Sequence, residues 1–324
     1  MIKIAAYAVG DIGVASSRLR SFYLFQSSSD YGVNVSRNLS IRQSLTCDCL
    51  HLQKSYKPKH IAQALLFCLL GKKVIFDIDD NPKGKYKVAA IVLMRIANFV
   101  TTDTDLRREY FSKYVNKNKI FVLPDVLDID PNKVDQVISR KNSRSKGIFW
   151  IGHRDNLGSI EKLLDVIADR ADYHMVVATK LAQNDLLHTK YPKVTFIDWR
   201  LDVSLDPDID VVYMILNHDT GVDPDAIYKS ENKMVLSIAS GLIPIVSRTP
   251  AYEMLAQTLD AERLIFNELD EVFSIIESLD PIWLQHFMTR ARKYILDNYT
   301  DKRVFLKFKA QCMKINNLSG RVID

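Results

Sequence analysis

Two lysines four residues apart, Lys229 and Lys233, flank the predicted start of a helix in the second half of the chain. Ser230 stands between them as a capping residue, and Gly241 is placed to end the helix. Two ammonium groups beside the free N–H groups of a helix N-terminus would serve a diphosphate well. An ordinary capped helix with two solvated lysines explains the same pattern, and the phosphate-loop sequence GxxxxGK[ST] is absent.

Three carboxylates, Asp77, Asp79 and Asp80, stand at the end of a predicted strand at 74–78. Acids clustered at a strand end can act as a base, bind a metal ion or orient the hydroxyl of an acceptor molecule. The local sequence supplies no further oxygen ligands for a metal ion. The alternative interpretation is a turn rich in helix-capping residues.

A loop with Gly13, Ser17 and Arg18 follows the predicted first strand, at 2–8. The backbone N–H groups of such a loop, with an arginine beside them, would suit an anion. The dinucleotide pattern GxGxxG is absent, and a plain turn with a serine cap fits equally well. Lys54 follows the strand predicted at 45–52 and is a further candidate, because ligands bind beyond the carboxyl ends of parallel strands.

In the second half of the chain, Gly152 and Arg154 follow the strand predicted at 147–151. A glycine turn, a helix N-terminus and an arginine together suit a phosphate group. Trp199 and Arg200 follow another predicted strand, where an indole and a guanidinium could stack on a nucleotide base. A plain turn after 151 and a packing role for Trp199 stay open as alternatives.

Cys47, Cys49 and His51 would share one face of a strand, and their side chains are of the type that binds zinc. No second pair of ligands lies nearby in the sequence, so a buried strand is the simpler interpretation and we expect no metal ion. The four cysteines of the chain are too few and too unevenly spaced for a disulfide framework. This predicts a reducing, cytoplasmic setting.

The elements that must position these residues alternate between short β-branched runs and longer amphipathic segments. This alternation predicts βαβ units, an α/β fold and parallel sheets. The pattern restarts after the polar basic stretch 141–146, which we interpret as a linker between two doubly wound, Rossmann-like domains at 1–140 and 147–300, facing each other across a cleft. The predicted strands are 2–8, 45–52, 74–78, 99–102 and 120–123 in the first domain, and 147–151, 174–177, 194–197, 211–215, 243–246 and 264–266 in the second.

Length and composition agree with this organisation. The chain has 324 residues, 47% of them apolar and 26% charged, which is ordinary for a globular protein with two domains. No apolar run is long enough to span a bilayer, and the first residues resemble a strand more than a signal peptide.

Positive charge is concentrated in the first half of the chain. Residues 1–140 hold 21 Lys/Arg and 13 Asp/Glu, a net charge of +8, whereas residues 141–324 hold 23 and 26, a net charge of −3. Such a basic half suggests a phosphate, a nucleic acid or an anionic membrane surface as a partner, with solvated faces as the alternative. The apolar segment 60–70, with lysines at both ends, fits either a membrane surface or a helix packed inside the domain.

Seven segments of the chain resemble the GT-B glycosyltransferases, in particular the retaining, family 4-like enzymes that build bacterial surface polysaccharides. The resemblance covers most of the chain, in the expected order and spacing. The matching segments are ASSRLRS, VIFDIDD, FVTTDTDLRREY, KIFVLPDVLD, IFWIGHRDN, KSENKMVLSIASGLIPIVS and AYEML.

The resemblance implies a nucleotide-diphospho-sugar donor in the second domain, an acceptor in the first, and no metal or other cofactor. Asp79 or Asp80 would orient the acceptor hydroxyl as catalytic residues. A C-terminal helix, 301–324, would cross back to the first domain. The remaining site residues would be Gly13, Ser17, Arg18 and Lys54 for the acceptor, and Gly152, Arg154, Trp199, Arg200, Lys229, Ser230 and Lys233 for the donor.

Two positions depart from the family pattern. Related enzymes commonly carry a glutamate that contacts the donor ribose and an acidic partner upstream, where this chain has Leu236 and Tyr228. The expected function is nonetheless a hexosyltransferase-like enzyme (EC 2.4) that transfers a sugar with retention to a glycan or lipid-linked glycan. It would act in the cytoplasm or peripherally at the inner membrane face, without nucleic acid. The alternative is a non-catalytic protein of the same fold that binds nucleotides or sugars.

Overall fold

The computed structural model describes residues 2–130, 133, 146–181, 187–206, 208–218 and 223–319. The chain divides into two compact units, here called the first unit (Met1–Val126 with Asn298–Asp324) and the second unit (Leu127–Asp297). Within the described residues, no helix combines the length and the hydropathy needed to cross a membrane.

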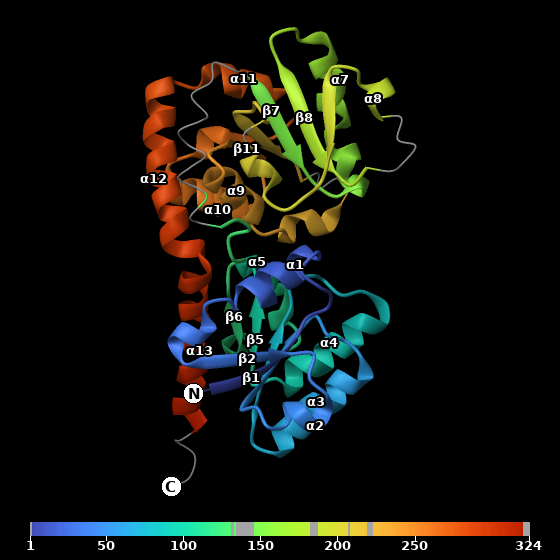
Figure 1. Ribbon diagram of the computed structural model, residues 1–324, viewed down its shortest axis with the longest axis vertical. Helices are drawn as coiled ribbons and strands as arrows, with labels where there is room; N and C mark the ends of the chain where they lie inside the picture. Colours follow the sequence, from blue (N-terminus) through green and yellow to red (C-terminus); the bar gives the residue numbers. More distant parts are fainter. Residues whose placement is uncertain are drawn as a thin grey trace. The chain divides into compact units, whose positions relative to one another are not determined.

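Each unit is built on one six-stranded parallel sheet (Figure 1). The strand order is β2-β1-β3-β4-β5-β6 in the first unit and β12-β11-β10-β7-β8-β9 in the second, so both sheets are doubly wound as predicted. The strands are β1 (Ile2–Tyr7), β2 (Val33–Arg37), β3 (Cys49–Gln53), β4 (Lys73–Asp77), β5 (Phe99–Thr102), β6 (Ile120–Val122), β7 (Gly147–Ile151), β8 (His174–Thr179), β9 (Val194–Asp198), β10 (Tyr213–Leu216), β11 (Ile243–Ser247) and β12 (Ile265–Phe266).

Helices connect these strands on both faces of each sheet. The α-helices of the first unit are α1 (Ala15–Ser17), α2 (Ile41–Ser44), α3 (Pro58–Leu69), α4 (Gly84–Ile96), α5 (Asp105–Ser112) and α13 (Asp301–Ser319). Those of the second are α7 (Glu161–Asp169), α8 (Leu187–Lys190), α9 (Asn232–Ala239), α10 (Pro250–Leu259), α11 (Glu271–Ser278) and α12 (Pro281–Tyr299). Shorter helical turns include a π-helix, η1 (Arg18–Tyr23), and two 3-10 turns, η4 (Arg154–Ile160) and η6 (Pro224–Tyr228).

Two differences from the predicted elements have local causes. β2 was not predicted; it is an edge strand with only two apolar residues, Val33 and Val35, so it lacks a strong hydrophobic signal. The strand predicted at 45–52 begins only at Cys49, because a capping box between Ser40 and Gln43 starts a helical turn just upstream.

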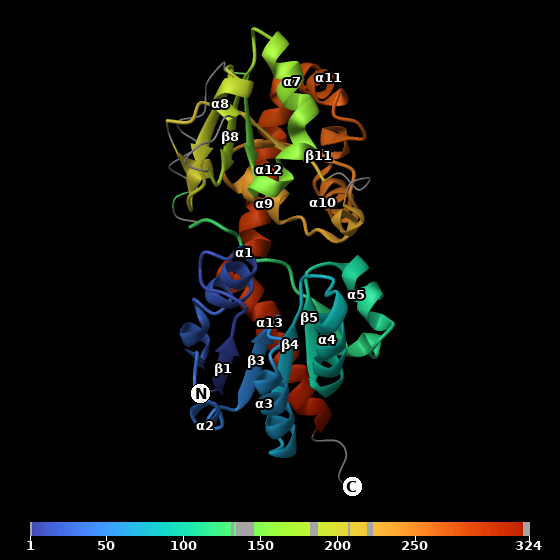
Figure 2. The same ribbon diagram turned by 90° about the vertical axis from the view of Figure 1, so that its right-hand side faces the viewer.

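Helices cover both faces of the first sheet (Figure 2), and each face has its own apolar core. Phe67 of α3 and Leu93 of α4 belong to the core on one face. Phe25, Phe305 and Phe308 belong to the core on the other face, which α13 covers. The C-terminal helix is therefore part of the hydrophobic core of the first unit.

The observed boundaries of the units differ from the predicted ones. The first unit ends at Val126, whereas we expected it to reach residue 140. Most of the predicted linker, 141–145, lies outside the described residues. The chain passes back to the first unit at Asn298, inside α12, close to the expected position.

Alanine at Phe308 tests how much α13 contributes to the first unit. Phe308 is 2% exposed, and its ring lies 5.4 Å from that of Phe25 between centroids. We expect Phe308→Ala to lower the free energy of unfolding by about 3–5 kcal/mol, because it removes a buried aromatic ring and leaves a cavity. The control is Leu306→Ala on the same helix, where the side chain is 38% exposed. Similar losses for the two variants in urea titrations would contradict a core role for the helix.

Candidate functional site

The strand orders place a topological switch point in each sheet, between β1 and β3 in the first unit and between β7 and β10 in the second. Ligands of doubly wound folds bind beyond the carboxyl ends of the strands at such points. The predicted site residues lie at these two edges, which we describe separately.

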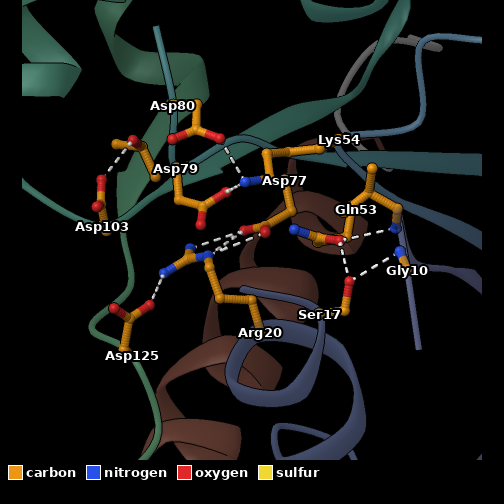
Figure 3. A network of polar contacts seen from close by, with 12 residues as sticks. Gly10, Ser17, Arg20, Gln53, Lys54, Asp77, Asp79, Asp80, Asp103 and Asp125 are labelled. Carbon is orange, nitrogen blue, oxygen red and sulfur yellow. Dashed lines mark hydrogen bonds and ion pairs between the residues drawn. The ribbon is translucent and has the colours of Figure 1, made fainter. Parts of the chain in front are cut away.

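At the first switch point, the loop after β1 is held by its own side chains (Figure 3). The Gly10 N–H donates to Ser17 Oγ at 3.0 Å. Arg18 is 1% exposed, and its guanidinium donates to the Ile12 carbonyl at 2.9 Å. Both predicted acceptor-binding side chains, Ser17 and Arg18, thus shape the loop, while Gly13 is exposed within it.

The central interaction of this edge is a buried ion pair between Arg20 and Asp77. Arg20 lies on η1, is 2% exposed and donates to both oxygens of Asp77 at 2.7–3.2 Å. Its other nitrogen donates to Asp125 and to the Leu123 carbonyl, each at 2.9 Å. Thr101 Oγ1 donates a further hydrogen bond to Asp77. Burial alone would raise the pKa of Asp77, but Arg20 outweighs it and holds the pKa below its ordinary value.

Lys54 lies between the two predicted catalytic carboxylates. Its ammonium is 3.2 Å from Asp79 and also pairs with Asp80, so its charge already has partners within the unit. The Lys54 backbone is left-handed, with φ at 46°, a conformation that is uncommon for residues other than glycine. Burial raises the pKa of Asp79, whereas the Asp80 side chain is 58% exposed.

Asp103, directly after β5, is a site residue that the sequence did not reveal. It is 5% exposed, and Arg107 Nε lies 3.0 Å from its carboxylate. Burial raises its pKa to about 8; the charges of Asp125 and Asp79 act in the same direction, and those of Arg107 and Arg20 oppose the shift. In the sequence, its position directly after a predicted strand is what could have indicated a site residue, but many residues with a purely structural role occupy such positions.

At the second switch point, Lys233 joins helix α9 to the end of β7. Its ammonium donates to the Ile151 carbonyl at 3.0 Å and lies 5.8 Å from the centroid of the Trp150 ring. Burial, assisted by the nearby charge of Lys229, lowers its pKa to about 8. No carboxylate among the described residues pairs with Lys233. A cation on the first turn of a helix is also disfavoured by the helix dipole, so an anion here would relieve both penalties.

His218, after β10, is a second residue that the sequence did not indicate. Its ring stacks on Tyr252 at 5.5 Å, and its Nε2 is 3.0 Å from the Tyr252 hydroxyl. Burial lowers its pKa to about 3, and the charges of Lys233 and Lys229 act in the same direction. A neutral imidazole therefore faces the lysine pair.

Four other predicted donor residues follow two different strands, β7 and β9. Gly152 follows β7 where a Cβ would come within 2.5 Å of the Trp150 ring, so packing already requires a glycine there. Arg154 begins the turn η4, and no α-helix starts before Glu161. Arg200 lies beyond β9, is exposed and pairs with Asp206, while Trp199 is partly buried beside it.

A cavity of about 890 Å³ opens at the carboxyl ends of β10, β11 and β12, beside α7. Its lining includes Ser159, Lys162, Asn217, His218 and Arg248, but none of the predicted donor residues. The volume is within the range of small-molecule sites. His218, which lines this cavity, is close enough to Lys233 for the lysine charge to lower the pKa of its ring.

The positions that depart from the family pattern can be located as well. Leu236 is 7% exposed on α9, within the core of the second unit. Tyr228 ends the turn η6. Glu231, 7% exposed at the N-cap of α9, is a buried carboxylate close to both positions in the sequence.

Comparisons with known proteins identify the fold. No family model and no curated protein matches the sequence. Among solved structures, a sucrose-phosphate synthase from Thermosynechococcus elongatus superposes with a TM-score of 0.71 at 10% identity, covering 98% of this chain and 100% of that one.

Two further structures match over nearly their whole length. Anabaena HepE in complex with UDP and glucose has a TM-score of 0.63 at 9% identity, covering 97% of this chain and 100% of that one. An alpha-glucosyltransferase in complex with UDP and a 13-mer DNA has a TM-score of 0.64 at 12% identity, covering 97% and 99%. These likenesses show that the chain has the GT-B fold.

The raised pKa of Asp103 predicts a pH-dependent loss of stability. The unfolded chain ionises this carboxyl near its ordinary pKa, 3.8, and the folded chain only near 8, so stability falls as the pH rises between these values. Asp103→Asn removes this dependence. We expect its unfolding free energy, relative to wild type, to increase by at least about 1 kcal/mol from about pH 5 to pH 9.

Asp105→Asn is the matched control for this measurement, because that side chain on α5 is 63% exposed. Its difference from wild type should stay constant with pH in urea titrations. A constant difference for Asp103→Asn as well would show that Asp103 is ionised in the folded protein at neutral pH.

Proposed function

We propose that this protein is a glycosyltransferase whose second unit binds a nucleotide-diphospho-sugar and whose first unit binds the hydroxyl-bearing acceptor. The observation that carries the proposal is Lys233, a half-buried cation without a carboxylate partner among the described residues, at the start of α9. A diphosphate supplies the missing negative charge. The UDP complexes of two structures with the same fold support a nucleotide as the donor group.

The proposed chemistry is transfer with retention to a glycan or lipid-linked glycan, as in hexosyltransferases. Lys233 and Lys229, with the N–H groups of α9, would stabilise the charge that develops on the leaving diphosphate. That diphosphate then accepts the proton of the acceptor hydroxyl, so no other base is required. Asp79 would orient the hydroxyl, because it is the less exposed of the two carboxylates beside Lys54.

A non-catalytic binding protein of the same fold is the second candidate. Leu236, buried where related enzymes carry the glutamate that contacts ribose, favours it. Glu231 is the carboxylate of α9 that could replace this contact in an enzyme. Hydrolysis or transfer of a nucleotide sugar by the purified protein distinguishes the two, since a binding protein would bind the nucleotide without turnover.

The donor site can be tested with Lys233→Ala. Loss of a charge-assisted phosphate contact, worth about 1.5–3 kcal/mol, should weaken binding of the best nucleotide sugar from a thermal-shift screen at least about tenfold. Because the pKa of Lys233 is about 8, wild-type affinity should also fall from about pH 7 to pH 9. The donor affinity of Lys233→Ala should not decrease over this pH range.

Lys54→Ala is the control, because Lys54 is paired within the first unit and its removal should leave donor affinity unchanged. Titration calorimetry measures the donor affinity of the wild type and of both variants. Equal donor affinity in wild type and Lys233→Ala would exclude the proposed donor site.

We also propose peripheral attachment to an anionic membrane surface, in a cytoplasmic protein, through helices α3 and α4. These helices contact each other and expose apolar side chains, including Leu69 (84%) and Val88 (65%). Exposed lysines accompany them, among them Lys59 and Lys85. Apolar insertion together with positive charge is the combination by which proteins bind an interface.

Leu69→Asp should reduce sedimentation with anionic vesicles about tenfold at low salt. The substitution replaces an apolar side chain that would insert into the membrane by a carboxylate, which the anionic lipids repel. Val166→Asp serves as the control; Val166 is 41% exposed on α7 of the second unit. Binding of wild type should fall steeply with added salt. Equal sedimentation with anionic and neutral vesicles would rule out this attachment.

A further inference from the structure

Gln53 is the last residue of β3 and is 0% exposed, yet half of its side-chain amide has no partner. Its Oε1 accepts from the Val9 N–H at 3.0 Å and from Ser17 Oγ at 3.4 Å. Its Nε2 has no hydrogen-bond partner among the residues that the structure describes. The Val9 contact fixes the orientation of the amide, because a flipped amide would place an NH2 group against an N–H donor.

The unpartnered nitrogen lies at the edge where the acidic residues meet. Gln53 and Asp77 are register partners on adjacent parallel strands, so their side chains emerge on the same face of the sheet. In Figure 3 the amide oxygen of Gln53 points toward Gly10 and Ser17, and its nitrogen points toward Asp77, the last residue of β4. Asp77 already receives hydrogen bonds from Arg20 and Thr101.

Asp79 supplies an acceptor at the same edge. Its buried Oδ1 has Lys54 Nζ at 3.2 Å as an ion-pair partner, and a carboxylate oxygen can accept a further hydrogen bond. A buried donor or acceptor without a partner costs about 1–3 kcal/mol. A polyhydroxyl ligand can bind both groups, because each hydroxyl donates one hydrogen bond and accepts others.

We propose that Gln53 is an acceptor-binding residue, whose Nε2 donates to an oxygen of a neutral polyhydroxyl acceptor while Asp79 accepts from the acceptor's hydroxyl. This inference rests on the proposed function, in which the first unit binds the acceptor. It also favours a neutral substrate. Arg20, Lys54 and Arg107 are each already paired with a carboxylate of this edge, so these cations are not free to bind a phosphate, whereas the amide N–H of Gln53 can bind an uncharged hydroxyl group.

Gln63 offers an internal control for this assignment. It is also buried, at 2% exposed, but its Nε2 donates to the Tyr7 hydroxyl at 3.0 Å and to Ser44 Oγ at 2.5 Å. Both glutamines contribute to packing, and only Gln53 has a donor left for a ligand. If Gln53 had only a structural role, its side-chain amide and that of Gln63 would therefore respond alike to an added ligand.

The direct test observes the side-chain amide resonances of ¹⁵N-glutamine-labelled protein during titration with the methyl glycosides of glucose, galactose and mannose. We expect the Gln53 amide signals to shift with at least one glycoside, and the Gln63 signals to stay in place. If no glycoside moves the Gln53 signals while the wild type hydrolyses its nucleotide sugar, the inference is wrong and the proposed function stands. If the wild type neither binds nor hydrolyses any nucleotide sugar, the proposed function itself fails.

Gln53→Glu adds a kinetic test with the glycoside that shifts the signals. The variant keeps an oxygen for Val9 and Ser17 but at alkaline pH lacks the donor, so the KM for the glycoside should rise about tenfold or more, with kcat and the donor KM little changed. At mildly acidic pH the carboxyl regains a proton and an O–H donor, so this difference should narrow. Gln53→Leu should show the raised KM at every pH. A pH-independent KM in Gln53→Glu, or an unchanged KM in Gln53→Leu, would overturn the assignment.

Discussion

The buried ion pair between Arg20 and Asp77 is the interaction on which the edge of the first unit depends. Removing two charges from water is expensive, and the pair is tolerated because every polar atom of Asp77 is engaged by Arg20 and Thr101. Arg20 also reaches Asp125 after β6, so one guanidinium ties η1 to strands β4 and β6. The neighbouring polar residues are positioned against this fixed centre.

Lys233 in the second unit is the opposite case. It is a half-buried cation, and its partners are a carbonyl and an aromatic ring, which do not neutralise its charge. A cation that is partly removed from water without an opposite charge beside it lowers stability, so stability alone does not explain a lysine here. The contrast between Arg20 and Lys233 separates a structural cation from one that is positioned for an anionic ligand.

Much of the fold was predictable because hydrophobic periodicity is local. Every predicted strand exists, and Gly241 follows α9 with φ at 73°, as a helix-ending glycine requires. β2 escaped prediction because an edge strand buries little apolar surface. The candidate site was less predictable. Lys233, Asp79 and Lys54 were found from their places at element ends, whereas Arg18 and Ser17 shape their own loop.

The sequence by itself determined the α/β class, the parallel sheets and the residues that follow the strands, because these properties depend on side-chain type and spacing along the chain. Only the tertiary structure decided which polar atoms are satisfied. Gln53 and Gln63 are the same residue type and both are buried, yet of the two only Gln53 keeps an unpartnered donor. Asp103 likewise differs from Asp105 through burial among other charges. Partners distant in sequence set these differences, and no local pattern encodes them.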